Sequence, residues 1–194
     1  MKPRAFFMAV ALCAAASFGA AQPPAPPVQD GVSTDAPLAL TFALSSDAVL
    51  DGNLLNQQFT CDGAGESPPL SWKNAPAGTK SFALTMHHYP PAGEEKHVYL
   101  VVYDLPATLD HLEAGTTAGR WGSNTVNRKA AYTPPCSQGP GRKEYILTVY
   151  ALSQVPVFVE AGGAVIMDDL LEAVQDTTLA TATLTVGYVR PDGK

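Results

Sequence analysis

The sequence predicts a mainly β domain with one helix near its C-terminus. Seventeen prolines and sixteen glycines among 194 residues separate short apolar runs, a spacing typical of strands joined by turns. Most of these runs alternate apolar and polar residues, which is the period of a half-buried strand, and only one segment repeats its apolar residues every four positions. With 46% hydrophobic and 15% charged residues, the chain has the composition of a globular domain with a substantial core.

The first 37 residues are expected to lie outside that domain. Residues 1–21 place Lys2 and Arg4 before an apolar run that ends in small residues, which is the pattern of a secretory signal peptide. A retained membrane anchor is the alternative, although the run is short for a bilayer span of about 20 residues. Residues 22–37 are rich in proline and predict an extended linker. We therefore expect a secreted or periplasmic protein whose folded domain begins at Leu38.

Seven segments have the pattern of a strand. Their ranges are 38–44, 57–60, 70–72, 81–87, 97–104, 145–152 and 182–189. The fifth of them is apolar almost throughout, as expected of a strand that is buried on both faces. Residues 165–176 form the helical segment. Its apolar residues Ile166, Leu170 and Val174 recur at a spacing of four, and acidic residues come early, where the helix dipole favours them.

Cysteine usage predicts one disulfide. Cys13 would leave with the signal peptide, so Cys61 and Cys136 would remain in a chain sent to an oxidising compartment, where pairing is expected. The bridge would pin residues 115–141, an irregular stretch that predicts a long loop, against the segment around Cys61. The alternative is a reactive thiol with a histidine partner, which would need a reducing site.

The charge and the motifs argue against several functional classes. A formal net charge of −6 makes the electrostatic term repulsive for nucleic acid and for anionic lipid. His87, His88 and His97 invite a metal site, but their spacing is not that of a structural zinc site. Moreover, strand neighbours such as His87 and His88 point to opposite faces. No common catalytic or nucleotide-binding motif occurs, so no cofactor, no metal and no catalytic residue are expected.

Several motifs occur in an order that matches a known family. They are Cys61-Asp62-Gly63, Ser67-Pro68-Pro69-Leu70-Ser71-Trp72, Pro76-Ala77-Gly78-Thr79-Lys80-Ser81-Phe82, Val101-Val102-Tyr103-Asp104-Leu105-Pro106 and Pro134-Pro135-Cys136. With these motifs the chain resembles the phosphatidylethanolamine-binding protein family, in particular its bacterial Raf-kinase-inhibitor-like branch, over residues 38–190. The resemblance implies packed antiparallel sheets of Greek-key type with a C-terminal helix, a small anion-binding pocket near one end, and a binding or regulatory role.

The chain departs from the family pattern at that pocket. An Asp-Pro-Asp-x-Pro loop is common in the family, whereas this chain has His88-Tyr89-Pro90-Pro91. Tyr99 stands at one histidine position, and His97 lies two residues earlier on the same face of the strand. Lys143 stands at a second position where the family has histidine. The pocket residues that the resemblance implies are therefore His88, His97, Tyr99, Pro134, Lys143 and Tyr145.

The leading hypothesis is a protein without chemistry of its own that binds a small anionic ligand, or a segment of a partner protein, in this pocket. Ammonium and phenol donors suit phosphate, sulfate or carboxylate. A second hypothesis is an interaction module, such as an inhibitor of a secreted hydrolase, whose linker and loops form the contact surface. A metal-dependent enzyme that uses the histidines is a third. Taken singly, Tyr99 and Tyr145 also fit ordinary strand aromatics, and Lys143 fits a solvated charge.

Overall fold

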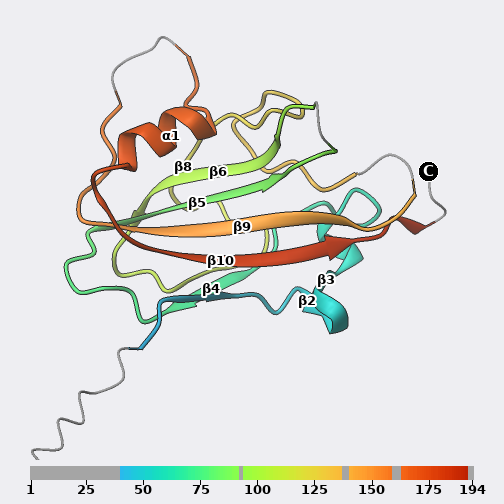
Figure 1. Cartoon of the computed structure of the whole chain (residues 1–194), viewed down its shortest axis with the longest axis horizontal. Helices are drawn as coiled ribbons and strands as arrows, with labels where there is room; N and C mark the ends of the chain where they lie inside the picture. Colours follow the sequence, from blue (N-terminus) through green and yellow to red (C-terminus); the bar gives the residue numbers. More distant parts are fainter. Residues whose placement is uncertain (1–39, 92–93, 137–139, 159–162, 192–194) are drawn as a thin grey trace, which may run out of the picture. The chain divides into compact units, whose positions relative to one another are not determined.

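The computed structural model describes residues 40–91, 94–136, 140–158 and 163–191 (Figure 1). The predicted signal peptide at 1–21 and the predicted linker at 22–37 lie outside the described residues. Strands dominate the described part, and its one α-helix lies near the C-terminus. The prediction of a mainly β fold with a C-terminal helix is therefore confirmed.

The described strands form two sheets. The larger sheet has the order β2 (Val49–Leu50), β3 (Leu54–Leu55), β10 (Thr178–Tyr188), β9 (Lys143–Leu152), β5 (Ser81–His88), β6 (His97–Pro106) and β8 (Arg120–Trp121). The smaller sheet has the order β1 (Ala43–Ser45), β4 (Leu70–Lys73) and β7 (His111–Leu112). Neighbouring strands are antiparallel except β10 and β3, which are parallel where Gly187 meets Leu54.

The main core lies between the two sheets. Alternation along β5 turns Phe82, Leu84 and Met86 toward the smaller sheet, and all three side chains are at most 1% exposed. Trp72 of β4 meets Phe82 with ring centroids 5.1 Å apart. Strand β6 is buried along nearly its whole length, as its apolar sequence predicts.

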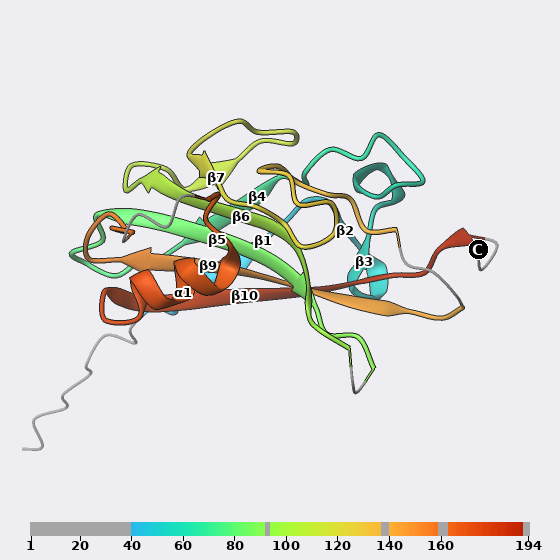
Figure 2. The same ribbon diagram turned by 90° about the horizontal axis from the view of Figure 1, so that it is seen from above.

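The opposite face of the larger sheet carries α1 (Met167–Val174; Figure 2). The three buried residues of this helix recur every three or four positions and pack on the sheet in a second apolar cluster. In its first turn the Asp169 carboxylate accepts a hydrogen bond from the Ile166 N–H at 2.9 Å, which agrees with the predicted place of acidic residues. No helix in the described residues is long and apolar enough to cross a membrane.

The prediction of a strand at residues 57–60 is wrong. Gln57–Phe59 instead forms a turn of 3-10 helix, η2. Asn56 begins this turn, because its side chain accepts a hydrogen bond from the Gln58 N–H at 3.0 Å. Local capping of this kind satisfies a backbone donor without a neighbouring strand.

Two other predicted strands differ at their ends. The strand predicted at 38–44 covers only Ala43–Ser45, where it pairs with β4. Strand β10 begins at Thr178 rather than at 182. Its first residues read Thr-Leu-Ala-Thr, and their alternation of apolar and polar residues is too weak to have indicated a strand. The strands predicted at 70–72, 81–87, 97–104 and 145–152 all lie within strands of the structure.

The loop predicted at 115–141 contains the short strand β8 and lies along the outer side of β6. Three backbone N–H groups of this loop donate to β6 carbonyls at 2.9–3.0 Å, from Gly122 to Val101, from Thr125 to Val98 and from Thr133 to Tyr99. In strand β8, Trp121 pairs with Val102 and Arg120 pairs with Tyr103 in antiparallel fashion. One edge of the larger sheet is therefore occupied by backbone hydrogen bonds.

Candidate functional site

Three of the predicted pocket residues meet at one end of the larger sheet. His88 ends β5, His97 begins β6 and Lys143 begins β9. Because these neighbouring strands are antiparallel, the end of β5 lies beside the starts of the other two, and His88 pairs directly with His97. The topology thus brings together side chains that are far apart in the sequence.

Four aromatic rings form a continuous chain at this end of the sheet. The ring centroid of His88 lies 6.3 Å from that of His97 and 5.5 Å from that of Tyr145. The Tyr145 ring in turn lies 5.2 Å from Tyr99. Tyr99 is 6% exposed and Tyr145 is 0% exposed, whereas His97 is exposed and His88 is half-buried. The two tyrosines therefore form an interior layer behind the histidines.

An open pocket of about 460 Å³ lies beside this layer. It is lined by His88, Tyr89, Pro90, Pro91, Arg142, Lys143, Glu144 and Ile146. Of the predicted pocket residues, the structure places His88 and Lys143 in the lining. Tyr99 and Tyr145 lie in the interior, and His97 is exposed outside the lining.

Pro134 also lies outside the lining. Its neighbour Thr133 donates its backbone N–H to the Tyr99 carbonyl at 2.9 Å. On its other side, a Cβ at Gly65 would lie 3.3 Å from Cγ of Pro134, and Gly65 has a φ of 70°, which glycine adopts without strain. Pro134 thus joins the interior tyrosine layer to the segment that follows Cys61.

The hydrogen bonding of His88 fixes which ring nitrogen remains for a ligand. Its Nδ1 lies 2.7 Å from the backbone carbonyl oxygen of Glu144. Because a carbonyl oxygen only accepts, Nδ1 carries a hydrogen and donates it. Nε2 is then an acceptor in the neutral ring and a donor in the protonated ring.

The charges in the pocket lining are not equivalent. Arg142 donates from Nη1 to the Gly52 carbonyl at 2.8 Å, and its Nε lies 3.7 Å from the Glu144 carboxylate. Lys143 is half-buried, and no ion pair within the described part of the chain includes it. Lys143 is therefore the lining cation whose charge is least compensated.

The sequence did not identify Arg142 or Tyr89 as pocket residues. The guanidinium group of Arg142 lies against Gly187, at a place where a Cβ would collide with it. The absence of a side chain at Gly187 therefore leaves room for Arg142 at the pocket. Tyr89 is 62% exposed at the pocket, and its ring meets the His87 ring edge-on at 4.9 Å. The Arg142-Lys143 pair just before an apolar strand was the one signal in the sequence that pointed to a basic lining.

Tyr99 and Tyr132 keep their hydroxyl protons at neutral pH. Burial raises the pKa of Tyr99, and the neighbouring Tyr145 adds to this shift. Burial also raises the pKa of Tyr132, whose hydroxyl donates to the Phe59 carbonyl at 2.7 Å. Phenolate chemistry therefore has no support at Tyr99 or Tyr132, and these two phenols act as hydrogen-bonding groups and packing surfaces.

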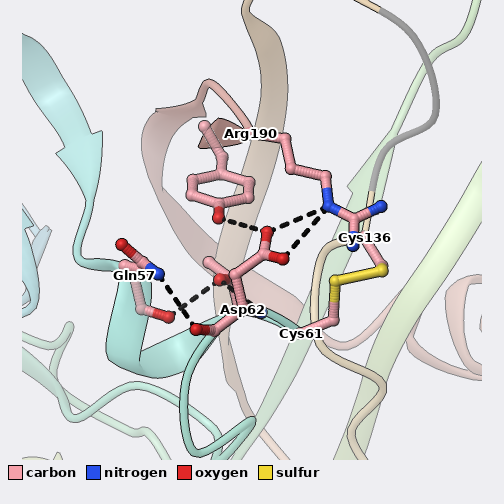
Figure 3. Close-up of a disulfide and its surroundings, with 7 residues drawn as sticks. Gln57, Cys61, Asp62, Cys136 and Arg190 are labelled. Carbon is pink, nitrogen blue, oxygen red and sulfur yellow. Dashed lines mark hydrogen bonds and ion pairs between the residues drawn. A yellow bond between two sulfur atoms is a disulfide. The ribbon is translucent and has the colours of Figure 1, made fainter. Parts of the chain in front are cut away.

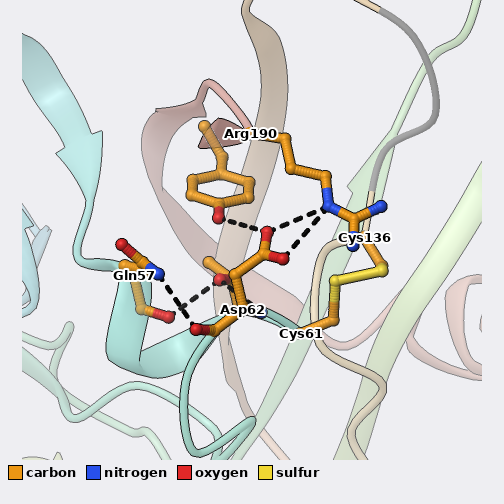
Figure 4. A network of polar contacts seen from close by, with 7 residues as sticks. Gln57, Cys61, Asp62, Cys136 and Arg190 are labelled. Atoms are coloured by element: carbon orange, nitrogen blue, oxygen red, sulfur yellow. Dashed lines mark hydrogen bonds and ion pairs between the residues drawn. A yellow bond between two sulfur atoms is a disulfide. The ribbon is translucent and has the colours of Figure 1, made fainter. Parts of the chain in front are cut away.

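The segment around Cys61 forms a structural brace. The structure joins Cys61 and Cys136 by a disulfide with a Cα–Cα distance of 5.2 Å (Figure 3). Arg190 donates from Nε to both carboxylate oxygens of Asp62 at 3.1 Å, and the Tyr188 hydroxyl donates to the same carboxylate at 2.6 Å (Figure 4). This brace ties the end of β10 to the disulfide.

His87 and His88 have different surroundings, as expected of neighbours on a strand. His87 is 6% exposed, and its Nδ1 has no hydrogen-bond partner among the described residues. Burial lowers the pKa of His87, and the charges of Lys96 and His88 add to the shift. In the described part of the chain, no group of three or more histidine, cysteine, aspartate or glutamate side chains is arranged to hold a metal ion.

The lowered pKa of His87 predicts a loss of stability in mild acid. Below about pH 6.5 the unfolded chain binds a proton at this histidine that the folded chain resists, so the free energy of unfolding falls as the pH falls, by at most ~1.4 kcal/mol per pH unit. His87→Phe, which keeps an aromatic ring, is expected to flatten this dependence in urea titrations between neutral and mildly acidic pH.

His111→Asn serves as the control for that experiment. His111 is exposed, and its hydrogen bond to Asp110 raises the pKa of its ring, so its contribution has the opposite sign. An unchanged slope in His87→Phe would show that His87 is not the group responsible.

Comparison with known proteins identifies the family. The family model described as phosphatidylethanolamine-binding protein matches residues 45–189. A UPF0098 protein of Chlamydia trachomatis is 31% identical over 150 residues, which is 75% of this chain and 97% of that protein. A UPF0098 protein of Methanothermobacter thermautotrophicus is 31% identical over 153 residues, with 76% and 97% covered.

Two solved structures are similar as well. The crystal structure of CT736 from Chlamydia trachomatis, described as a phosphatidylethanolamine-binding protein homolog, superposes with a TM-score of 0.69 at 30% identity, covering 77% of this chain and 98% of that one. YbcL of Escherichia coli, described as a member of the mammalian family, gives 0.67 at 26% identity, with 77% and 99% covered. This chain belongs to the phosphatidylethanolamine-binding protein family, among its bacterial members.

Proposed function

We propose that this protein binds a small anionic ligand, such as a phosphate, sulfate or carboxylate group, in the pocket lined by His88 and Lys143. The observation that carries the proposal is Lys143, a half-buried residue that lines an open pocket and has no ion-pair partner among the described residues. A cation whose charge is not offset by a neighbouring carboxylate attracts an anion more strongly than a paired one.

The neighbours of Lys143 sharpen this proposal. His88 offers Nε2, which donates to an anion when the ring is protonated. Glu144 works against anion binding, but its carboxylate lies 3.7 Å from Arg142, which offsets its charge. The proposal is for binding alone, and it gives none of these side chains a bond-making step. It also places the protein outside the cytoplasm, supported by the pattern of residues 1–21 and by the Cys61–Cys136 disulfide.

Titration with inorganic phosphate and with sulfate, followed by amide NMR, tests the proposal. Signals of β9 residues near Lys143 are expected to shift, and Lys143→Ala is expected to weaken binding by about tenfold, the loss of one charge-assisted hydrogen bond. Lys80→Ala is the matched control, because Lys80 is exposed just before β5, at the far end of that strand from His88. Equal weakening in the two variants would mean that only net charge matters and would contradict a site at Lys143.

A segment of another protein is the second candidate occupant. It is favoured by Tyr89, which is 62% exposed at the pocket beside Pro90 and Pro91. Exposed aromatic residues are enriched where proteins bind one another. If phosphate and sulfate leave the NMR spectrum unchanged, while an acidic peptide shifts the same signals and Tyr89→Ala weakens that shift, this second occupant replaces the first.

A further inference from the structure

Two histidines lie directly opposite each other at one end of the larger sheet. His88 ends β5, His97 begins β6, and the two residues are partners in the antiparallel ladder. Residues that are directly opposite in such a ladder have their side chains on the same face, with Cβ atoms about 4.5–5.5 Å apart. The two ring centroids are 6.3 Å apart, and the ring planes are tilted by 53°. The imidazoles are therefore neighbours on one face of the sheet.

The hydrogen bond of His88 turns its second ring nitrogen toward His97. Nδ1 of His88 donates to the backbone carbonyl of Glu144, which belongs to β9. Strand β5 lies between β9 and β6 in the sheet (Figure 1), and the two nitrogens of an imidazole are on different sides of the ring. Because Nδ1 faces β9, Nε2 is turned toward β6, where His97 begins. In the neutral ring this nitrogen has a lone pair and no proton.

The separation of the two rings fits a metal ion that lies between them. Metal–nitrogen bonds to imidazole are ~2.0–2.1 Å long, so two imidazoles on one ion have ring centroids roughly 5–6.5 Å apart. The observed 6.3 Å lies within this range, and His97 is exposed, so its ring turns without a loss of packing. A metal-bound histidine usually donates its other N–H to a carboxylate, a backbone carbonyl or water. Glu144 already supplies such a carbonyl to His88.

We propose that His88 and His97 bind one divalent transition-metal ion, with copper(II) bound most tightly. Imidazole suits copper and zinc, and copper(II) has the highest affinity in the divalent first-row series. Two side chains hold the ion, and its other positions are open to water. In the part of the chain that the structure describes, no group of three or more histidine, cysteine, aspartate or glutamate side chains is arranged for a metal. The pair is therefore an exposed binding site and not a structural metal centre.

The charges around the two histidines do not attract a cation. Lys143 begins β9 and has no ion-pair partner among the described residues, so its charge opposes the ion. The Glu144 carboxylate lies 3.7 Å from Nε of Arg142, which offsets it. Lys96, which precedes the second histidine, forms an ion pair with Asp168 of α1. The ion is thus held by its bonds to the imidazole nitrogens rather than by net charge.

Metal binding and the proposed anion binding use His88 in opposite protonation states. A metal takes the lone pair of the neutral ring, whereas an anion accepts a hydrogen bond from the protonated ring. The other titratable neighbours are His87, on the opposite face of β5, and Tyr145, whose ring lies 5.5 Å from the His88 ring. Metal affinity is therefore expected to rise from mildly acidic to neutral pH, while anion affinity falls. The metal site goes beyond the proposed function and does not depend on it.

Titration of the full-length protein with copper(II) tests the proposal. The protein carries no affinity tag and has Cys13→Ser, so that no tag or free thiol binds the metal. Calorimetry at neutral pH, in a buffer without phosphate, is expected to give one ion per chain. The electron paramagnetic resonance spectrum of the bound ion is expected to show splitting by two imidazole nitrogens. His97→Gln, at an exposed position, is expected to weaken binding by more than about tenfold, because one of two ligands is lost.

Two further variants locate the ion. His88→Gln is expected to weaken copper binding as His97→Gln does. His111→Asn is the matched control and is expected to bind as the wild type, because exposed His111 lies in the smaller sheet, beside Asp110 and Glu113. No copper binding by the wild type, unchanged binding in His97→Gln, or loss of binding in His111→Asn would overturn the proposal.

Sulfate binding by His97→Gln separates this proposal from the proposed function. His97 lies outside the lining of the pocket that contains Lys143. The variant is therefore expected to lose copper binding and to keep sulfate binding. Copper binding by two imidazoles in a protein that binds no sulfate would support the metal site alone, and sulfate binding without copper binding would overturn the metal site alone.

Discussion

Replacement of both Cys61 and Cys136 by alanine is expected to lower the free energy of unfolding by ~4 kcal/mol. The disulfide joins residues that are 75 positions apart, and closing a loop of this length restricts the unfolded chain. The folded state also depends on the bridge, because it holds the end of the 115–141 loop beside Asp62, where β10 is tied down. Urea denaturation followed by circular dichroism measures the loss.

Two comparisons control this experiment. In urea that contains a reductant, the wild type is expected to have about the same free energy of unfolding as the double variant, because both lack the Cys61–Cys136 bridge. Cys13→Ala is expected to behave as the wild type in the absence of reductant, since the disulfide pairs the other two cysteines. A loss of less than ~1 kcal/mol in the double variant would contradict the structural role of the bridge.

Trp72→Ala is expected to lower the free energy of unfolding by ~3–5 kcal/mol, as for large buried aromatics. Trp72 is 4% exposed and packs on Phe82 between the two sheets. Its indole N–H donates to the Leu109 carbonyl at 3.1 Å, so the substitution leaves a cavity and removes a hydrogen bond. Trp72→Phe should lose less, because it keeps most of the ring volume.

The second tryptophan of the chain is the matched control. Trp121 lies in β8 and is half-buried against the main core. Trp121→Ala is therefore expected to cost ~1–2 kcal/mol. Equal costs at the two positions would contradict the account in which Trp72 holds the sheets together.

The long strands were predictable because their sequences carry a strong periodic signal. Strand β5 alternates Phe82, Leu84 and Met86 toward the core, and β6 is apolar along nearly its whole length. The two-residue strands β7 and β8 were not predicted, because two residues have no period. The turn at Gln57–Phe59 depends on the hydrogen bond from the Gln58 N–H to the Asn56 side chain. Alternation of apolar and polar residues carries no information about such a bond, so the sequence pattern did not predict the turn.

The site was predictable only in part. His88 and Lys143 were placed in a pocket from their positions in family motifs, and the structure places them in the lining. The interior position of Tyr99 and Tyr145 depends on packing between strands from separate parts of the chain, which local sequence does not encode. The position of the Arg142 side chain depends on the absence of a side chain at Gly187, which lies 45 residues away in the sequence.

The most direct test of anion binding is to locate a heavy anion in a crystal of this protein. Selenate has the shape and charge of sulfate, and its selenium atom is found by anomalous scattering. We expect an anomalous peak in the pocket with oxygen atoms within hydrogen-bonding distance of Lys143 Nζ and near Nε2 of His88, and we expect it to be absent in Lys143→Ala. Selenate bound only at other sites, with the Lys143 pocket empty, would contradict the proposed function.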